Sequence, residues 1–201
     1  MSSTVSERQL YDIASRYGGF FTAKQAAMVG YAAPKRNYHV RAGNWVREQR
    51  GIFRLKAFPL PDRSDLVLWW LWSRNRQDEP QGIFSHQTAL SLHELTDLMP
   101  SRIHMTVPPG FRRSAKPPKS IVLHQAELQH YEMENIAGVP TTNALRTLLD
   151  LALTKDVESA ELRTAFVAAV KSGKITRAQL SQAEKDSNWT GTLQALQGRS
   201  G

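Results

Sequence analysis

The chain has 201 residues and a net charge of +8, with 41% hydrophobic residues and five tryptophans. This composition is typical of an ordered globular protein with room for a small domain and a medium one, and it excludes a disordered tail or a repeat array. The chain has no cysteine, which excludes disulfides, thiolate catalysis and cysteine-ligated metal centres and favours a reducing compartment.

The distribution of apolar residues excludes two further classes of protein. The first six residues are mostly polar and lack the apolar core that a secretory signal requires. The longest apolar run, residues 66–72, is about a third of the length needed to cross a bilayer. We therefore expect a cytoplasmic protein without a membrane-spanning segment.

The positive charge is concentrated near the N-terminal end. Residues 1–58 carry ten basic and three acidic side chains, so ten minus three, or +7, of the net charge of +8 falls in this segment. A basic block of this size attracts a polyanion through counterion release, and nucleic acid fits a folded cytoplasmic module best. The alternative is a basic surface that serves solubility alone.

Two helices are indicated early in this segment. Ser6 and Gln9 form a capping box, and apolar residues then recur at helical spacing until a pair of glycines stops the turn. Thr22 and Gln25 form a second capping box, which predicts a short second helix that closes at Gly30.

A third helix is predicted from Pro34 to a stop at Gly43, because proline is favoured in the first turn of a helix. Its apolar stripe is thin, since Val40 is the only aliphatic residue before the last turn. A helix this polar is expected to be exposed to solvent or to a polar partner.

Two short runs rich in β-forming residues follow, Trp45–Gln49 and residues 51–55, with Arg50 and Gly51 at the turn between them. This pattern predicts a β-hairpin. Three short helices followed by a basic hairpin are typical of a winged helix-turn-helix, whose last helix enters the major groove of DNA while the wing follows the phosphates. We therefore predict that the first segment binds double-stranded DNA.

The predicted roles of the side chains follow from their hydrogen-bonding chemistry. Arg36 and Arg41 can fork onto guanine or phosphate, and Asn37 can pair with adenine. Lys35 can reach a phosphate from the helix N-terminus, and Arg50 can enter the minor groove from the wing. The full set of predicted DNA contacts is Thr22, Lys24, Lys35, Arg36, Asn37, Tyr38, Arg41, Arg47 and Arg50.

Two alternatives stay open for this segment. Tyr38 and His39 can instead complete a small core, which would leave the arginines as the DNA contacts. Winged helices also serve as protein-interaction modules, and the exposed third helix would then bind a protein.

Prolines at positions 59 and 61 predict a linker, so we place a winged-helix domain at residues 1–58, an α+β domain at 62–190 and a tail at 191–201. Helix signals cover 65–74, 86–95, 143–153, 159–172 and 176–185; strand signals cover a short stretch from 84 and residues 102–107, 120–124 and 131–136. The predicted fold class is α+β: an N-terminal winged helix-turn-helix followed by a larger mixed α+β domain that ends in helices.

A proline-stiffened connection at residues 108–119 carries four cations, Arg112, Arg113, Lys116 and Lys119. These side chains are candidates for a contact with a phosphate or a protein partner. The alternative is a solvated connection that needs charge for solubility.

The sequence contains no catalytic or metal-binding motif. Among the six histidines, His86 and His93 can share a helix face, but only Glu94 or Asp97 is spaced to complete a zinc site. There is no Gly-rich phosphate loop, no nucleophile elbow and no Asp-x-Lys or Glu-x-Lys element of a magnesium-dependent nuclease. We therefore expect no metal, no cofactor and no enzymatic activity; the alternative, a nucleic-acid enzyme, would require metal-dependent cleavage by the purified protein.

Several runs of the sequence resemble one protein family. Residues 38–46 and 50–55 resemble the N-terminal domain of AbiEi-type antitoxins of bacterial type IV toxin–antitoxin systems. Residues 65–73, 84–93, 102–108 and 138–150 resemble the second domain of the same family, so the resemblance covers about residues 5–185.

The resemblance implies a DNA-binding repressor of its own operon, whose second domain counteracts a partner toxin that resembles nucleotidyltransferases. The alternative is a winged-helix transcriptional regulator with no toxin partner, whose second domain serves dimerisation or ligand sensing.

Overall fold

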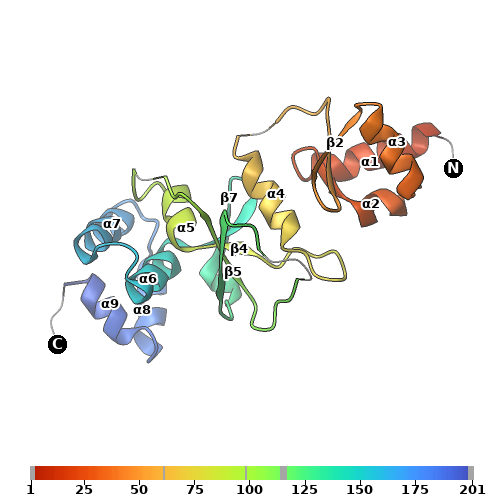
Figure 1. Cartoon of the computed structure of the whole chain (residues 1–201). Coiled ribbons are helices and arrows are strands. Elements are labelled where there is room, and N and C mark those ends of the chain that lie inside the picture. Colours follow the sequence, from red (N-terminus) through yellow and green to blue (C-terminus); the bar gives the residue numbers. More distant parts are fainter. Residues whose placement is uncertain (1–2, 61, 98, 114–116, 199–201) are drawn as a thin grey trace. The chain divides into compact units, whose positions relative to one another are not determined.

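The chain forms two compact units, residues 1–81 and residues 82–201. A computed structural model describes residues 3–60, 62–97, 99–113 and 117–198, with the helices and strands labelled in Figure 1. Each unit has its own sheet and its own helices.

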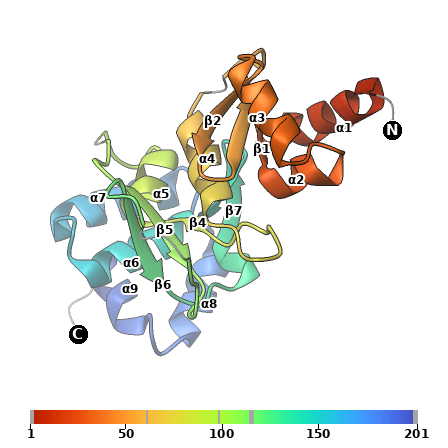
Figure 2. The same cartoon turned by 45° about the vertical axis from the view of Figure 1, so that its right-hand side comes forward.

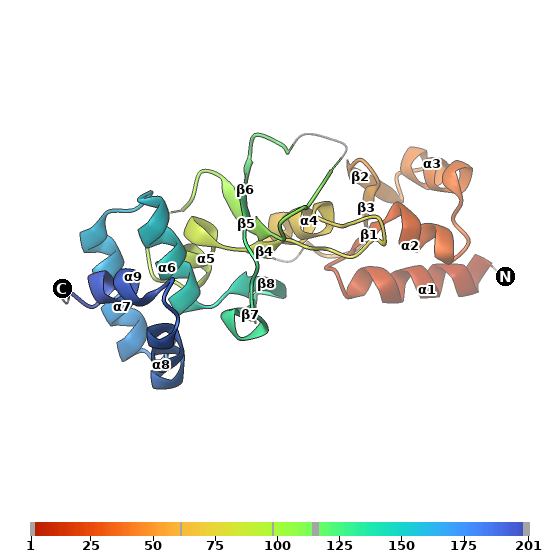
Figure 3. The same ribbon diagram turned by 90° about the horizontal axis from the view of Figure 1, so that it is seen from below.

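The first unit is built from short helices and a small sheet. Its elements are α1 (Ser3–Ser15), β1 (Phe20–Thr22), α2 (Ala23–Met28), α3 (Ala33–Arg41), β2 (Trp45–Gln49), β3 (Ile52–Leu55) and α4 (Ser64–Trp72). The strands form an antiparallel sheet in the order β1-β3-β2, and Figure 3 shows α1, α2 and α3 gathered beside it. The predicted three helices and hairpin of a winged helix-turn-helix are confirmed.

Aromatic rings join these elements into one core. Phe21 and Phe53 are stacked with centroids 5.9 Å apart, and Trp45 meets Phe21 edge-on at 4.8 Å. Leu10 and Ala14 of α1 belong to the same buried cluster. Edge-on and offset ring contacts are the favoured geometries for aromatic pairs, so the sheet and α1 are held by specific packing.

The start of α1 differs from the prediction. The helix begins at Ser3, and Ser6 is buried within it instead of serving as its N-cap. A Cβ placed on Gly30 would lie 3.4 Å from the Ser6 hydroxyl, so the small side chain of Ser6 allows α1 to pack closely on the turn after α2. Ser6 is therefore a packing residue.

The predicted capping box of α2 is confirmed. The Thr22 hydroxyl accepts a hydrogen bond from the backbone N–H of Gln25 at 3.1 Å, and the Gln25 side chain accepts one from the N–H of Thr22 at 2.8 Å. The two bonds satisfy backbone donors that have no partner inside the helix.

The predicted linker near residue 60 does not end the first unit. Beyond it, α4 packs on β1 and β3 and buries Leu66, Leu71 and Trp72. The Trp70 ring of α4 also lies 5.9 Å from that of Tyr17. The structure thus divides the chain after residue 81 instead of at 58–62, because the apolar helix α4 covers the first sheet.

The second unit is a five-stranded sheet followed by helices. Its elements are β4 (Ile83–Phe84), α5 (His86–Leu92), β5 (Ile103–Val107), β6 (Ile121–Gln125), a short 3-10 helix η1 (His130–Glu132), β7 (Met133–Ile136), β8 (Val139–Thr142), α6 (Ala144–Thr154), α7 (Ser159–Lys171), α8 (Arg177–Lys185) and α9 (Thr190–Leu196). The strand order is β6-β5-β4-β8-β7. β5 runs parallel to β6, as Figure 2 shows, and β4 runs parallel to β8, whereas the other pairs are antiparallel. The predicted mixed α+β class with helices at the end is confirmed.

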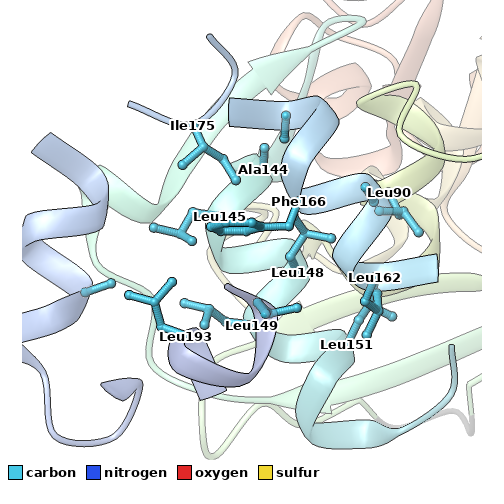
Figure 4. Packing of buried hydrophobic residues seen from close by; sticks show 14 residues of the cluster. Leu90, Ala144, Leu145, Leu148, Leu149, Leu151, Leu162, Phe166, Ile175 and Leu193 are labelled. Atoms are coloured by element: carbon cyan, nitrogen blue, oxygen red, sulfur yellow. The ribbon is translucent and has the colours of Figure 1, made fainter. Parts of the chain in front are cut away.

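The main apolar core of this unit lies between its helices. Figure 4 shows Leu148 of α6, Phe166 of α7 and Leu193 of α9 in one cluster of buried side chains. Leu193 and Leu196 are only 1% and 4% exposed, so the predicted tail at 191–201 is wrong over the length of α9. Residues 199–201 lie outside the described residues. Within the described ranges, no helix is long and apolar enough to cross a membrane.

Candidate nucleic-acid interface

Helix α3 presents a polar surface. None of its residues is buried, and Asn37, Tyr38 and Arg41 are all exposed, with Tyr38 at 64%. The helix starts with Pro34 in its first turn and without a side-chain cap. Its exposed face therefore carries an amide, a phenol and a guanidinium that a groove of DNA could accommodate.

Two basic side chains of α3 are partly engaged within the unit. Arg36 donates from Nη1 to the backbone carbonyl of Tyr31 at 2.7 Å. The ammonium of Lys35 lies 4.2 Å from the centroid of the Tyr31 ring, within the range of a cation–π contact. Arg36 and Lys35 thus hold the start of α3 to the turn before it, and both are half-buried.

The C-terminal half of α3 is attached through His39. Its ring stacks on Trp45 with centroids 4.7 Å apart and meets Tyr31 edge-on at 5.3 Å. Burial and the nearby Lys35 lower the pKa of His39, so the imidazole is neutral at pH 7. His39 thus packs against two rings of the core although it is only partly buried, whereas Tyr38 is exposed.

The β2–β3 hairpin forms the wing. Arg47 and Arg50 are exposed on it, and the Arg47 guanidinium lies 5.5 Å from the centroid of the Phe53 ring. Arg54 is paired with Glu48 at 2.7 Å, so it stabilises the hairpin. Arg47 and Arg50 are therefore the exposed cations of the wing that a phosphate backbone could contact.

The tip of the wing is supported by the segment that follows α4. Arg74 donates from Nη2 to the carbonyl of Gly51 at 3.2 Å and pairs through Nε with Asp78 at 2.9 Å. Gly51 has φ +74°, a conformation that suits glycine at a hairpin turn. Asp78 in turn accepts a hydrogen bond from the hydroxyl of Thr22. Arg74 and Asp78 thereby connect the wing to the start of α2.

This network corrects one predicted DNA contact and constrains another. The Thr22 side chain is fully buried and is occupied with the helix cap and Asp78, so Thr22 is not available to DNA. Lys24 is exposed, and its ammonium donates to the carbonyl of Gln77 at 3.0 Å. Sequence reasoning missed Arg74 because the segment from 62 onward was assigned to the second domain.

The four cations predicted at residues 108–119 lie in the connection between β5 and β6. Arg112 and Lys119 are exposed and Arg113 is half-buried, whereas Lys116 lies outside the described residues. Arg112 and Lys119 therefore face solvent at this connection. The connection joins two parallel strands, which explains its length, because parallel strands cannot be joined by a tight turn.

Three histidines of the second unit meet although they are far apart in the sequence. The rings of His86 and His124 are stacked with centroids 3.5 Å apart, and Nδ1 of His104 lies 3.1 Å from Nε2 of His124. Burial and the neighbouring histidines lower the pKa of His86 to about 3 and that of His104 to about 4. In the described part of the chain, no group of three or more histidine or acidic side chains is arranged to hold a metal ion.

A buried ionic network lies beside the helices of the same unit. Arg146 of α6 donates from Nη1 to Glu132 at 2.7 Å and from Nε to Asp150 at 2.9 Å. Its guanidinium also lies 4.9 Å from the centroid of the Trp189 ring. Arg146 thus ties η1, α6 and the start of α9 together.

Comparisons with known proteins bear on the fold. No family model matches the chain, and no curated protein matches it. The crystal structure of the RV2827C protein from Mycobacterium tuberculosis is similar, with a TM-score of 0.61 and 13% sequence identity, over 99% of this chain and 78% of that chain. At this level of identity the similarity shows a shared fold and nothing further.

Proposed function

We propose that this chain is a non-enzymatic, sequence-specific DNA-binding protein of the cytoplasm that represses its own operon. In this proposal α3 enters the major groove of double-stranded DNA and the β2–β3 wing follows the adjacent phosphates. Direct readout falls to the exposed Asn37, Tyr38 and Arg41, and Arg47 and Arg50 contact the backbone.

One observation carries the proposal: α3 has no buried residue and stands beside a wing with two exposed arginines. A helix with no buried residue gains little stability from packing, so its polar surface favours a role in binding. The first unit also carries thirteen basic and seven acidic side chains, thirteen minus seven or +6, within residues 1–81. This charge suits a polyanionic partner.

The resemblance to AbiEi-type antitoxins extends the proposal to a protein partner. We propose that the second unit counteracts a nucleotidyltransferase-like toxin, by a direct or an indirect route. The test is growth of cells that express such a toxin from a neighbouring gene, with and without this chain. Rescue by the Arg41→Ala variant as well as by the wild type would separate neutralisation from repression; failure of both would leave a winged-helix regulator without a toxin partner.

The experiment for DNA binding is a fluorescence-anisotropy titration of the whole chain against the DNA upstream of its own gene. A shuffled duplex of the same composition is the control, and both are measured at two salt concentrations. We expect the native sequence to bind roughly a thousandfold more tightly, in the range of specific regulators, and the affinity to fall steeply with salt. Equally weak binding of both duplexes would instead favour a protein-interaction module.

A further inference from the structure

His39 lies between the core of the first unit and the exposed face of α3. On the core side its ring is stacked on Trp45, with centroids 4.7 Å apart and planes at 15°. Trp45 is only 5% exposed and belongs to the buried cluster of this unit. The contact therefore fixes the plane of the imidazole against a ring that is itself held in the core.

The loop after α3 fixes the rotation of the same ring. Nδ2 of Asn44 lies 3.3 Å from Nδ1 of His39. Because an amide nitrogen only donates, Nδ1 accepts this hydrogen bond and the ring proton is on Nε2. The backbone N–H of Asn44 also donates to the carbonyl of His39 at 3.0 Å. The imidazole is thus held in one orientation and one tautomer.

On its other side the imidazole meets Tyr38. Consecutive residues of a helix project about 100° apart, so their side chains do not ordinarily face each other. Here the two rings meet edge-on, with centroids 5.4 Å apart and planes at 81°, which is a favoured geometry for aromatic pairs. Tyr38 is 64% exposed, so the imidazole restrains a ring that otherwise faces solvent.

This restraint matters for a side chain that contacts a partner. An exposed, freely rotating side chain loses conformational entropy when binding immobilises it, and that loss reduces the affinity. A ring that is already held in one orientation loses less. The chain of contacts from Trp45 through His39 to Tyr38 therefore prepares the phenol of α3 for a contact of defined direction.

We propose that His39 is a positioning residue for the reading of DNA, which holds the ring of Tyr38 in the orientation that contacts a base edge. The inference rests on the proposed DNA-binding function and adds to it a residue that acts through Tyr38. It predicts that selectivity between DNA sequences, and not only affinity, depends on the imidazole.

The test is a set of anisotropy titrations of the whole chain with the native upstream duplex and the shuffled duplex, read as the ratio of the two affinities. His39→Ala removes both ring contacts and should lower this ratio about fivefold to tenfold. His39→Phe keeps a ring that can stack on Trp45 and meet Tyr38, and it should stay within about twofold of the wild type.

Val40→Ala is the control for a purely structural effect. Val40 is the next residue of α3 and packs against the same buried cluster, so its truncation should lower the melting temperature in circular dichroism. A smaller folded fraction weakens binding to both duplexes alike, so the ratio of the affinities should not change.

A double-variant cycle shows whether His39 acts through Tyr38. In a Tyr38→Ala background, His39→Ala should cause no further loss of the ratio, since the ring that it positions is absent. If the wild type is selective, an unchanged ratio in His39→Ala, an equal loss in His39→Phe, or additive losses in the double variant would each overturn this inference alone. Equal binding of the two duplexes by the wild type would overturn the proposed function together with it.

Discussion

The arginines of α3 are not equivalent. Arg41, in the last turn, is exposed, whereas Arg36 in the first turn already donates to the carbonyl of Tyr31. A guanidinium has five N–H donors, so Arg36 can still contact a phosphate, but its position is fixed by the turn before the helix. Arg41 is therefore the arginine of α3 whose guanidinium is less engaged within the unit.

Replacing Arg41 tests this difference. We expect Arg41→Ala to reduce affinity for the cognate duplex by about 1 to 3 kcal/mol if the guanidinium reads a base, and Lys35→Ala to weaken all sequences to a similar degree. Arg8→Ala, which removes an exposed arginine from α1, should have little effect. Anisotropy titrations check all three, and an Arg41→Ala variant that binds like the wild type would show that this face of α3 is not the one that reads DNA.

The buried histidines predict an acid-sensitive second unit. His86 and His104 have pKa values of about 3 and 4 in the folded chain, against about 6.5 for an unfolded chain. Between these values the unfolded chain binds more protons, so the free energy of unfolding falls as the pH falls. Stability is full above pH 6.5, and we expect a loss of about 5 kcal/mol between pH 7 and pH 4.5 from the two histidines together.

Denaturant titrations at the two pH values measure this loss, with two variants for comparison. His86→Asn should flatten the pH dependence, because asparagine does not titrate and tolerates the positive φ of +52° at this position. His130→Asn changes an exposed histidine and should leave the dependence as it is. If His86→Asn loses as much stability between the two pH values as the wild type does, the histidine cluster does not cause the acid sensitivity.

Among the elements, the wing depends on a segment that sequence reasoning placed elsewhere. Arg74 joins the carbonyl of Gly51 to Asp78, and Asp78 is joined to the cap of α2 through Thr22. The wing and the helix that precedes α3 are therefore positioned by the same side chains.

We expect Arg74→Met to lower DNA affinity about fivefold although Arg74 need not touch DNA, because the tip of the wing loses a support. It should also reduce stability by about 1 to 3 kcal/mol, since Asp78 keeps its charge without its partner. Arg76→Met changes an exposed arginine two residues away and serves as the control. Anisotropy and thermal unfolding give the two readouts, and equal behaviour of the two variants would contradict the role of Arg74.

The elements that the sequence predicted well are those with local signals. The capping box at Thr22 and the turn at Gly51 depend on neighbours within a few residues, and both were located correctly. The strands β1 and β8 were missed, because β1 has three residues and β8 begins directly after the turn at Gly138. α9 was missed because its short apolar pattern is explained only by the core that it completes.

The sequence also predicted those features of the candidate site that depend on local pattern. The exposure of Asn37 and Arg41 follows from the polar sequence of α3. The burial of Thr22 and the role of Arg74 depend on a contact between residues more than fifty positions apart, which no local pattern encodes. The meeting of His86, His104 and His124 has the same origin, since it is set by the pairing of β5 with β6.

For the whole molecule, the position of the division between the units has a direct test. We expect a fragment of residues 1–81 to fold and unfold cooperatively by itself, and a fragment of residues 1–58 to lack a cooperative transition. The shorter fragment loses Leu66, Leu71 and Trp72, which are buried and are each worth about 1.5 to 3 kcal/mol. Calorimetry of the two fragments measures their thermal unfolding. Equal stability would show that the first domain ends at the predicted linker and not after residue 81.

Helix α3 is attached by its first turn, through Arg36 and Lys35, and by the stacking of His39 on Trp45. Asn37, Tyr38 and Arg41 contribute little to the core. Substitutions at these three positions therefore change what the surface recognises at small cost to folding. Under the proposed DNA-binding role, a few surface mutations of α3 would change the target sequence of the same scaffold at small cost to folding.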